Sequence, residues 1–146
     1  MQSGQQTQKK NVPLIIADHD IPYVATACAS YPFDFMNKVQ KAADVEGPAY
    51  IHVYSVCPTG WRVAPELTVD LGKLAVETGV FPLYEVENGV YKLNVKPAKL
   101  KPVEEYLKVQ GRFRHLKPDE IAEMQENVTK HWESLLRRIE SSQVPA

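Results

Sequence analysis

The spacing of apolar positions changes along the chain, and these changes predict strands and helices. Residues 21–27 and 49–56 are near-continuous apolar runs bounded by proline or glycine. Such runs are typical of strands that are buried on both faces of a parallel sheet. Residues 81–87 and 90–95 are predicted to pair as a hairpin, because the intervening Asn88-Gly89 is a strong signal for a two-residue turn.

Elsewhere apolar residues recur at steps of three and four, the period of an amphipathic helix. This spacing predicts helices over residues 32–43, 67–78 and 118–140. One or two helical turns are predicted over residues 13–19, because Pro13 suits a first helical turn, and residues 102–109 are predicted to form a short polar helix. Residues 112–116 are predicted to be extended. The helix at 32–43 has the stripe Phe35, Met36, Val39, Ala42 and Ala43. In the next helix the inward-facing residues are predicted to be Leu67, Leu71, Leu74 and Ala75, with Gly79 just beyond its end.

The helix at 118–140 has the longest stripe, and a stripe of that length needs a surface to lie on. Its members are Ile121, Met124, Val128, Trp132, Leu135 and Ile139. The surface could belong to this domain or to another subunit.

The order of elements predicts an α/β fold with a small, mostly parallel sheet, flanking helices, a hairpin and a long C-terminal helix. Two parallel strands and a hairpin make a small sheet, so we interpret the chain as part of a larger domain. We divide it into a flexible N-terminal segment (1–11), an α/β part-domain (12–95) and a helical C-terminal extension (96–146).

Composition excludes several classes of protein. The chain has 17 Lys and Arg against 18 Asp and Glu, so it lacks the basic excess of a dedicated nucleic-acid binder. It contains no apolar stretch of the length that spans a membrane, and its polar first ten residues do not resemble a secretory signal. Two cysteines do not make a secreted disulfide framework. We therefore expect a cytoplasmic protein that binds neither nucleic acid nor membrane.

One segment has an unusual composition, Cys57-Pro58-Thr59-Gly60-Trp61-Arg62, and it directly follows a predicted buried strand. Ligands of open α/β sheets bind at such strand ends. A thiol there could be a metal or cluster ligand, a nucleophile or, as most lone cysteines are, a packed small side chain.

Cys28 follows the other predicted parallel strand. The two thiols could be two ligands of one soft-metal site, a disulfide, or unrelated. A thiolate cage for zinc or an iron–sulfur cluster needs about four ligands, so this chain cannot complete one alone. His52 lies inside a predicted strand, and no histidine is placed by the sequence to activate Cys57.

Several segments together resemble one family. These are residues 21–27, Tyr31-Pro32, Gly47-Pro48, 57–62, 74–79 and 82–85. They are similar to the C-terminal half of the β subunit of pyruvate:ferredoxin oxidoreductase (pyruvate synthase) and its 2-oxoacid relatives. The resemblance runs from about Lys9 to the end of the long helix, and the C-P-T-G-W order is its most specific part.

The resemblance implies a thiamine-diphosphate-binding type of α/β domain and assigns roles near Cys57. That family holds thiamine diphosphate through Mg²⁺, and one [4Fe–4S] cluster whose fourth cysteine ligand corresponds to Cys57. Pro58, Thr59 and Gly60 would shape the turn, and their backbone would hydrogen-bond cluster sulfurs. The G-D-G and Asn motifs for thiamine diphosphate and the other three cysteines do not occur in this sequence, and Cys28 is not implied as a ligand.

The implied function is that of a piece of an enzyme. The parent complex would convert pyruvate and CoA to acetyl-CoA and CO₂ and reduce ferredoxin, with other subunits or a missing N-terminal half as partners. The isolated chain would be inactive and hold no intact cluster, and the identity of the 2-oxoacid would depend on the partners. The alternative is a non-catalytic binding or assembly module that keeps the fold and pairs through the Trp132 stripe.

Overall fold

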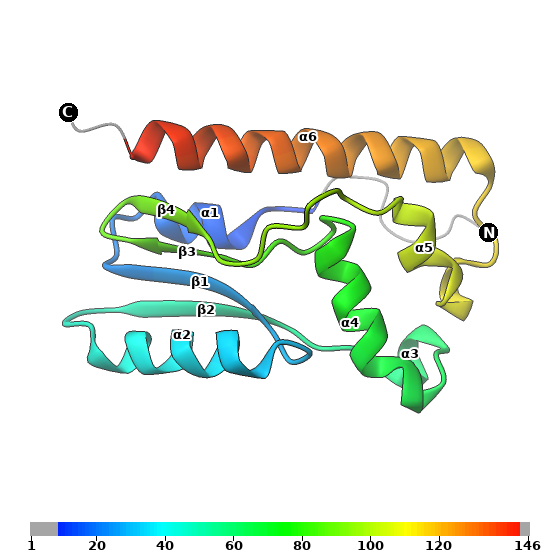
Figure 1. The fold of residues 1–146 in the computed structure, drawn as a ribbon, viewed down its shortest axis with the longest axis horizontal. Coiled ribbons are helices and arrows are strands. Elements are labelled where there is room, and N and C mark those ends of the chain that lie inside the picture. The colour runs from blue at the N-terminus through cyan, green and yellow to red at the C-terminus, as the bar shows by residue number, and fades with distance from the viewer. Residues whose placement is uncertain (1–8, 144–146) are drawn as a thin grey trace.

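A computed structural model describes residues 9–143, which form a four-stranded sheet flanked by helices (Figure 1). The strand order is β2-β1-β3-β4, and the strands are β1 (Tyr23–Cys28), β2 (Ala49–Tyr54), β3 (Tyr84–Glu87) and β4 (Val90–Leu93). The helices are α1 (Val12–Ala17), α2 (Pro32–Asp44), α3 (Pro58–Trp61), α4 (Thr68–Glu77), α5 (Val103–Lys108) and α6 (Pro118–Ser142). Short 3₁₀ turns cover Pro65–Leu67 and Gly111–Phe113.

The predicted α/β class is confirmed, and the sheet is mixed. β1 runs parallel to β2, with Ala25 opposite Ile51, and antiparallel to β3, with Val24 opposite Val86. Every residue of β1 is buried, as its apolar sequence predicts. The expectation that residues 49–56 are buried on both faces is wrong, because β2 is an edge strand whose residues are exposed or half-buried.

The predicted hairpin is confirmed between β3 and β4. Asn88 and Gly89 both have positive φ, 48° and 80°, which is the backbone of the two-residue turn that matches the twist of paired strands. The turn sets the register in which Glu87 lies opposite Val90. The hairpin therefore extends the sheet by two short strands on the edge of β1 opposite β2.

The α2 helix is present where it was predicted, but its apolar stripe does not face the core. Met36 and Val39 are 66% and 47% exposed, whereas Lys38 is 1% exposed. The ammonium of Lys38 donates to the backbone oxygen of Thr26 at 2.9 Å and to Asp34 at 2.7 Å. A charged residue is buried here because both its partners are supplied locally, one from β1 and one from its own helix.

The expected helix at 67–78 begins at Thr68, after a 3₁₀ turn. Leu71 and Ala75 are fully buried as predicted, but Leu67 is 39% exposed, which corrects its assignment to the inward face. Gly79 follows the helix with φ 77°, and its amide donates to the oxygen of Val76 at 3.0 Å. The predicted role of Gly79 in ending the helix is confirmed.

The long stripe of α6 lies on this domain itself. Ile121, Met124 and Val128 pack against the core cluster that α4 and α5 form, and Ile139 packs against the cluster between β1, β3 and β4. Leu135 is buried at 6% exposure. Figure 1 shows α6 running along the sheet beside β4. The question whether this surface belongs to another subunit is thereby answered.

Residues 112–116 and the N-terminal segment complete the description of the fold. Residues 112–116, predicted to be extended, instead begin within a 3₁₀ turn, so that expectation is wrong. Of the segment 1–11, predicted to be flexible, residues 1–8 lie outside the described residues. Within residues 9–143, no helix combines the length and apolar character that a membrane crossing requires.

Glu85 is the centre of a polar cluster on the face of the sheet that α2 covers. Its carboxylate is 2% exposed and accepts hydrogen bonds, each 3.0 Å long, from Tyr23, Lys41 and Asn94. Burial alone would raise the pKa of Glu85, but these hydrogen bonds and the charge of Lys41 outweigh it. They hold the pKa of this carboxyl below its ordinary value.

We expect Glu85→Gln to lower the free energy of unfolding at neutral pH by about 1–3 kcal/mol, because hydrogen bonds to a buried charge are lost. The pKa of Glu85 is lower in the folded state than in the unfolded state. Its stabilisation is therefore present above the unfolded pKa and is lost as the pH falls through the folded pKa. Urea unfolding at a series of acidic pH values should show a steeper loss of stability for the wild type than for the variant.

Glu87→Gln is the matched control for that measurement. Glu87 also pairs with Lys41, but its side chain is 47% exposed, so its replacement should cost no more than about 1 kcal/mol. If the wild type and Glu85→Gln lost stability in parallel as the pH fell, the role assigned to the buried carboxylate would be wrong.

Candidate functional site

Cys57 lies at the carboxyl end of β2, where the sequence predicts a turn. The strand ends at Tyr54, and Cys57 is the residue that precedes the short helix α3. Pro58 occupies the first helical position, which suits a residue without an N–H group. The Cys57 thiol is free and exposed. This turn therefore presents a thiol to the surroundings of the protein.

Gly60 and the start of α3 determine what surrounds the thiol. A Cβ atom on Gly60 would lie 3.2 Å from the Cys57 sulfur, so the glycine lets the thiol lie close over the turn. The first N–H groups of a helix have no acceptor within it, and here they belong to Thr59 and Gly60. The turn thus combines one accessible thiol with two backbone donors, the arrangement that stabilises a thiolate or a bound sulfide.

Trp61 packs within the chain. Its ring lies 5.7 Å from the ring of Tyr54, and the guanidinium of Arg112 lies 4.0 Å from the centre of the Trp61 ring. Gln110, which is fully buried, accepts a 2.9 Å hydrogen bond from Arg112 and donates to the oxygen of Tyr106. The turn after β2 is therefore braced by the segment around α5.

A second contact between the same segments depends on glycine. Arg62 has φ 55°, and its oxygen accepts a 3.2 Å hydrogen bond from the amide of Gly111. A Cβ atom on Gly111 would come within 2.7 Å of the Arg62 Cβ atom, which is closer than two such atoms approach. Sequence reasoning missed Arg112, Gln110 and Gly111, because no local pattern links them to a turn about fifty residues earlier.

Cys28 is a core residue. It is the last residue of β1, is 1% exposed, and packs with Val76 and Leu83. Its sulfur lies 3.8 Å from the oxygen of Gly72. The disulfide that the sequence left open is absent, since both cysteines are free, and burial removes the Cys28 thiol from the surface where Cys57 is exposed.

The aromatic side chains of β2 interact with one another and with neighbouring segments. The ring of His52 stacks on Phe81 at 5.9 Å, and its Nδ1 atom is 2.7 Å from the hydroxyl of Tyr50. The hydroxyls of Tyr54 and Tyr106 are 2.9 Å apart. Burial of the Tyr54 hydroxyl is the main cause, and its hydrogen bond with Tyr106 the second, of a pKa well above the ordinary value for tyrosine. These aromatic residues fill the space between β2 and the helices, and none of these contacts includes the Cys57 thiol.

A single cysteine can supply one ligand of a metal or cluster site. Within residues 9–143, no group of three or more His, Cys, Asp or Glu side chains could hold a metal ion. An iron–sulfur cluster needs about four thiolates. The described residues therefore offer Cys57 as one ligand, and the remaining ligands of such a site would have to come from other residues.

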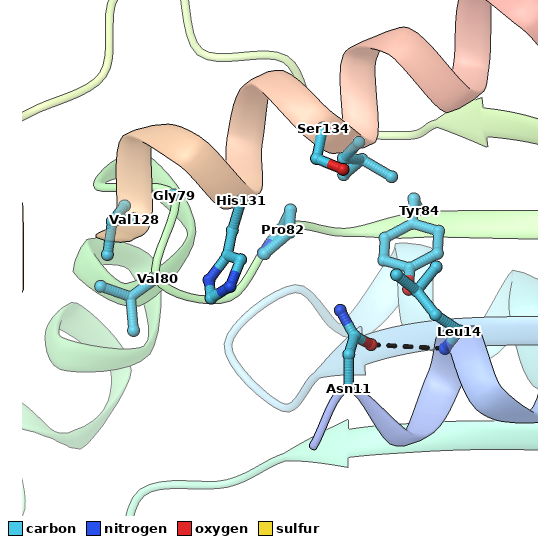
Figure 2. A pocket seen from close by; sticks show the side chains of 10 residues that line it. Asn11, Leu14, Gly79, Val80, Pro82, Tyr84, Val128, His131 and Ser134 are labelled. Atoms are coloured by element: carbon cyan, nitrogen blue, oxygen red, sulfur yellow. Dashed lines mark hydrogen bonds between the residues drawn. The ribbon is translucent and has the colours of Figure 1, made fainter. Parts of the chain in front are cut away.

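A small cavity of about 140 Å³ lies elsewhere, between α1, β3 and α6 (Figure 2). Figure 2 shows Asn11 and Leu14 on one side, His131 and Ser134 on another, and the ring of Tyr84 between them. The side-chain oxygen of Asn11 is engaged, because it accepts a hydrogen bond from the amide of Leu14 at 3.3 Å. The residues predicted from the sequence to be functional are not part of this cavity.

Comparison with known proteins gives strong similarities over most of the chain. It is 55% identical over 125 residues to the pyruvate synthase subunit PorB of Methanocaldococcus jannaschii and 57% identical to that of Methanothermobacter marburgensis. These alignments cover 86% of this chain and 42% and 43% of the two relatives. It is also 44% identical over 138 residues to the ketoisovalerate oxidoreductase subunit VorB of Pyrococcus abyssi, covering 93% of this chain and 44% of that relative.

No protein-family model matches the chain. The chain spans less than half the length of the curated relatives that it matches. The identity extends over most of the chain, and it agrees with the family that the C-P-T-G-W segment indicates. This identity makes the chain a homologue of the PorB and VorB subunits over the segment that it shares with them.

Proposed function

We propose that this chain works as part of the β subunit of a 2-oxoacid:ferredoxin oxidoreductase whose substrate is pyruvate. The observation that carries the proposal is the identity of 55–57% to two subunits named pyruvate synthase PorB. Five subunits named PorB are 45–57% identical to the chain and three named VorB are 42–44% identical, and this order favours pyruvate within the wider class of 2-oxoacids. The partners are the other subunits of the complex and the part of the subunit that this chain does not match.

In the proposed reaction, pyruvate and CoA give acetyl-CoA and CO₂, and two electrons pass to ferredoxin. Bound thiamine diphosphate with Mg²⁺ and the iron–sulfur clusters would supply carbanion stabilisation and electron transfer. No residue of this chain is assigned to thiamine diphosphate. The isolated chain is expected to be inactive.

Cys57 is the proposed ligand to one iron of a [4Fe–4S] cluster. Its exposure at the end of β2 supports this role, because a ligand must reach a cluster that other residues complete. Pro58 fixes the start of the turn, and the amides of Thr59 and Gly60 are the proposed donors to cluster sulfurs. Hydrogen bonds of that kind tune the reduction potential of a cluster.

The helical extension of residues 96–146 has a proposed supporting role in this site. Arg112 stacks on Trp61, and Gly111 bonds to Arg62, so the extension holds the turn that presents Cys57. The alternative of an assembly module that pairs through the Trp132 stripe has no observation in its favour. Leu135 of that stripe is buried, and Ile121, Met124 and Val128 pack against this domain.

The test is anaerobic co-expression of the chain with its partner subunits and with the remaining part of the β subunit. We expect the purified complex to reduce a viologen dye when pyruvate and CoA are present, and to do so more slowly with 2-ketoisovalerate. The chain purified alone is the control and should show no such activity. A complex without 2-oxoacid-dependent dye reduction would contradict the proposed function, and activity of the chain alone would contradict its proposed dependence on partners.

A further inference from the structure

Arg112 is a half-buried cation whose contacts within the described residues are to neutral groups. Its Nε atom donates to the side-chain oxygen of Gln110 at 2.9 Å. Its guanidinium lies 4.0 Å from the centre of the Trp61 ring and 4.6 Å from that of Phe113. None of the ion pairs among residues 9–143 includes Arg112. A charge that is partly withdrawn from water without a counter-ion costs free energy, so an anion outside the described residues would offset this cost.

The sequence around Arg112 supplies no such anion. Residues 108–117 contain four Lys and Arg side chains and no Asp or Glu. A Cβ atom on Gly111 would lie 2.7 Å from the Cβ atom of Arg62 and 3.6 Å from the Nε atom of Arg114, and both of these arginines are exposed. Three arginines therefore lie around one glycine, in a segment that is positive although the chain as a whole has a net charge of −1.

The backbone holds Arg112 against the turn that presents Cys57. The amide of Trp61, on whose ring Arg112 stacks, donates to the oxygen of Cys57 at 3.0 Å, so a single helical turn joins the two residues. The amide of Gly111 donates to the oxygen of Arg62 at 3.2 Å, which fixes the segment of Arg112 to the residue that ends α3. The charge of Arg112 is thus kept next to the turn by its stacking and by the backbone beside it.

We propose that Arg112 supplies a counter-charge to the iron–sulfur cluster that Cys57 ligates, and that this charge raises the reduction potential of the cluster. The inference rests on the proposed function and adds to it a residue that sets the potential. A cluster bound by about four thiolates is an anion. Its reduction adds one electron, which comes from the oxidation of pyruvate and passes on to ferredoxin, and no bond forms or breaks at Arg112. A fixed positive charge favours the more negative, reduced form and so raises the potential.

Coulomb's law gives the expected size of the effect. At a separation on the order of 10 Å and an effective dielectric constant of about 20, a unit charge changes a one-electron equilibrium roughly tenfold. A tenfold change corresponds to about 59 mV for a one-electron couple. The potential therefore detects the loss of one charge, whereas the loss of a purely structural brace would change the stability of the complex and its cluster content instead.

The experiment uses the assembled complex, purified anaerobically. The cluster is recognised as the one whose electron paramagnetic resonance signal is absent from Cys57→Ala, and a redox titration of that signal measures its potential. Arg112→Met removes the charge and keeps an apolar stem against Trp61, so the ratio of reduced to oxidised cluster at a fixed potential should fall about tenfold. Arg112→Gln is a second neutral variant and should show the same fall. Arg112→Lys loses the planar stacking and the Nε hydrogen bond but keeps the charge, so its ratio should stay within about threefold of the wild type.

Arg138→Met is the matched control, because it removes the same charge far from Cys57. Arg138 is 42% exposed, lies 4.0 Å from Asp18 and belongs to the last turns of α6. Figure 1 shows that end of α6 and the helix α3 on opposite sides of the molecule. The cluster potential of this variant should equal that of the wild type. Thermal unfolding of each variant measures the bracing contribution of Arg112, which should fall in the Lys variant as well as in the two neutral ones.

Three results would overturn the inference. The first is an unchanged potential in Arg112→Met and Arg112→Gln; a weaker association of the subunits in these variants would then show that Arg112 pairs with an acidic group of a partner. The second is an equal fall in Arg112→Lys, and the third is a fall of the same size in Arg138→Met.

The proposed function is judged separately, by pyruvate-dependent dye reduction in the wild-type complex. Activity together with an unchanged potential in the neutral variants would remove this inference and leave the function. The expected shift of potential in a complex that does not oxidise pyruvate would do the reverse. A complex in which Cys57→Ala removes no cluster signal would overturn the inference together with the ligand role of Cys57.

Discussion

Replacing Cys57 with alanine is expected to remove the [4Fe–4S] cluster from the assembled complex. The substitution deletes the one exposed thiol in the described part of the chain, and no neighbouring His, Cys, Asp or Glu cluster can take its place there. Loss of a second-sphere partner already costs ten- to a hundredfold in metal affinity or activity, so loss of a ligand should lower pyruvate-dependent dye reduction by at least about a hundredfold. Iron and sulfide analysis of the anaerobically purified complex measures the cluster directly.

Cys28→Ala is the matched thiol control for that measurement. Cys28 is buried against Val76 and Leu83, so its replacement should lower stability and leave the iron content unchanged. Cys57→Ala should have the opposite profile, because an exposed side chain contributes little to the free energy of unfolding. Equal iron and sulfide in wild type and Cys57→Ala would remove the ligand assignment. Loss of iron from Cys28→Ala at a temperature where the chain is folded would do the same.

The elements of this fold could be predicted where local chemistry determines them. Asn88-Gly89 specifies a turn by its backbone preferences alone, and Gly79 ends α4 for a similar reason. The stripe of α6 keeps the right period over about five turns, from Ile121 to Ile139, and it packs on the chain's own core. In these cases the conformational preferences and spacing of residues close together in the sequence determine the local structure.

The faces of α2 and β2 could not be predicted, because a periodic pattern reports which residues are apolar and not what lies beside them. The stripe containing Met36 is exposed, and the side chain that α2 buries is the charged Lys38. Lys38 is accommodated by Asp34 and by the backbone of Thr26, and only the folded sheet brings that backbone near. In both elements the tertiary neighbours, and not the period, determine which side chains are buried.

The candidate site was predictable in part. The order C-P-T-G-W locates Cys57 at a strand end, and the exposed thiol in the structure is compatible with the ligand role that the family resemblance implies. The bracing of that turn was not predictable, because Gln110 and Arg112 reach it from a separate segment through tertiary packing. No periodicity or motif in a single sequence records such a contact.

Substitutions of Leu67 and Leu71, near the start of α4, test whether the predicted stripe or the observed packing determines which leucine belongs to the core. The sequence places Leu67 and Leu71 on one helical face, four residues apart. In the structure, residues 65–67 wind as a 3₁₀ turn, which has 3.0 residues per turn and rotates Leu67 away from the core. Leu71 is 0% exposed and packs with Ala75 and Val103, whereas Leu67 is 39% exposed.

Leu71→Ala is therefore expected to lower the free energy of unfolding by about 2–5 kcal/mol, because it removes buried methyl groups and leaves a cavity. Leu67→Ala should cost less than about 1 kcal/mol, since its side chain is already partly exposed to solvent and lies outside the buried core. Urea unfolding of the chain, followed by circular dichroism, measures both on the same scale. Costs of similar size would mean that α4 extends to Leu67 and buries the whole stripe, as the period alone suggests. A large difference would show that the 3₁₀ turn, rather than the period, determines which leucine belongs to the core.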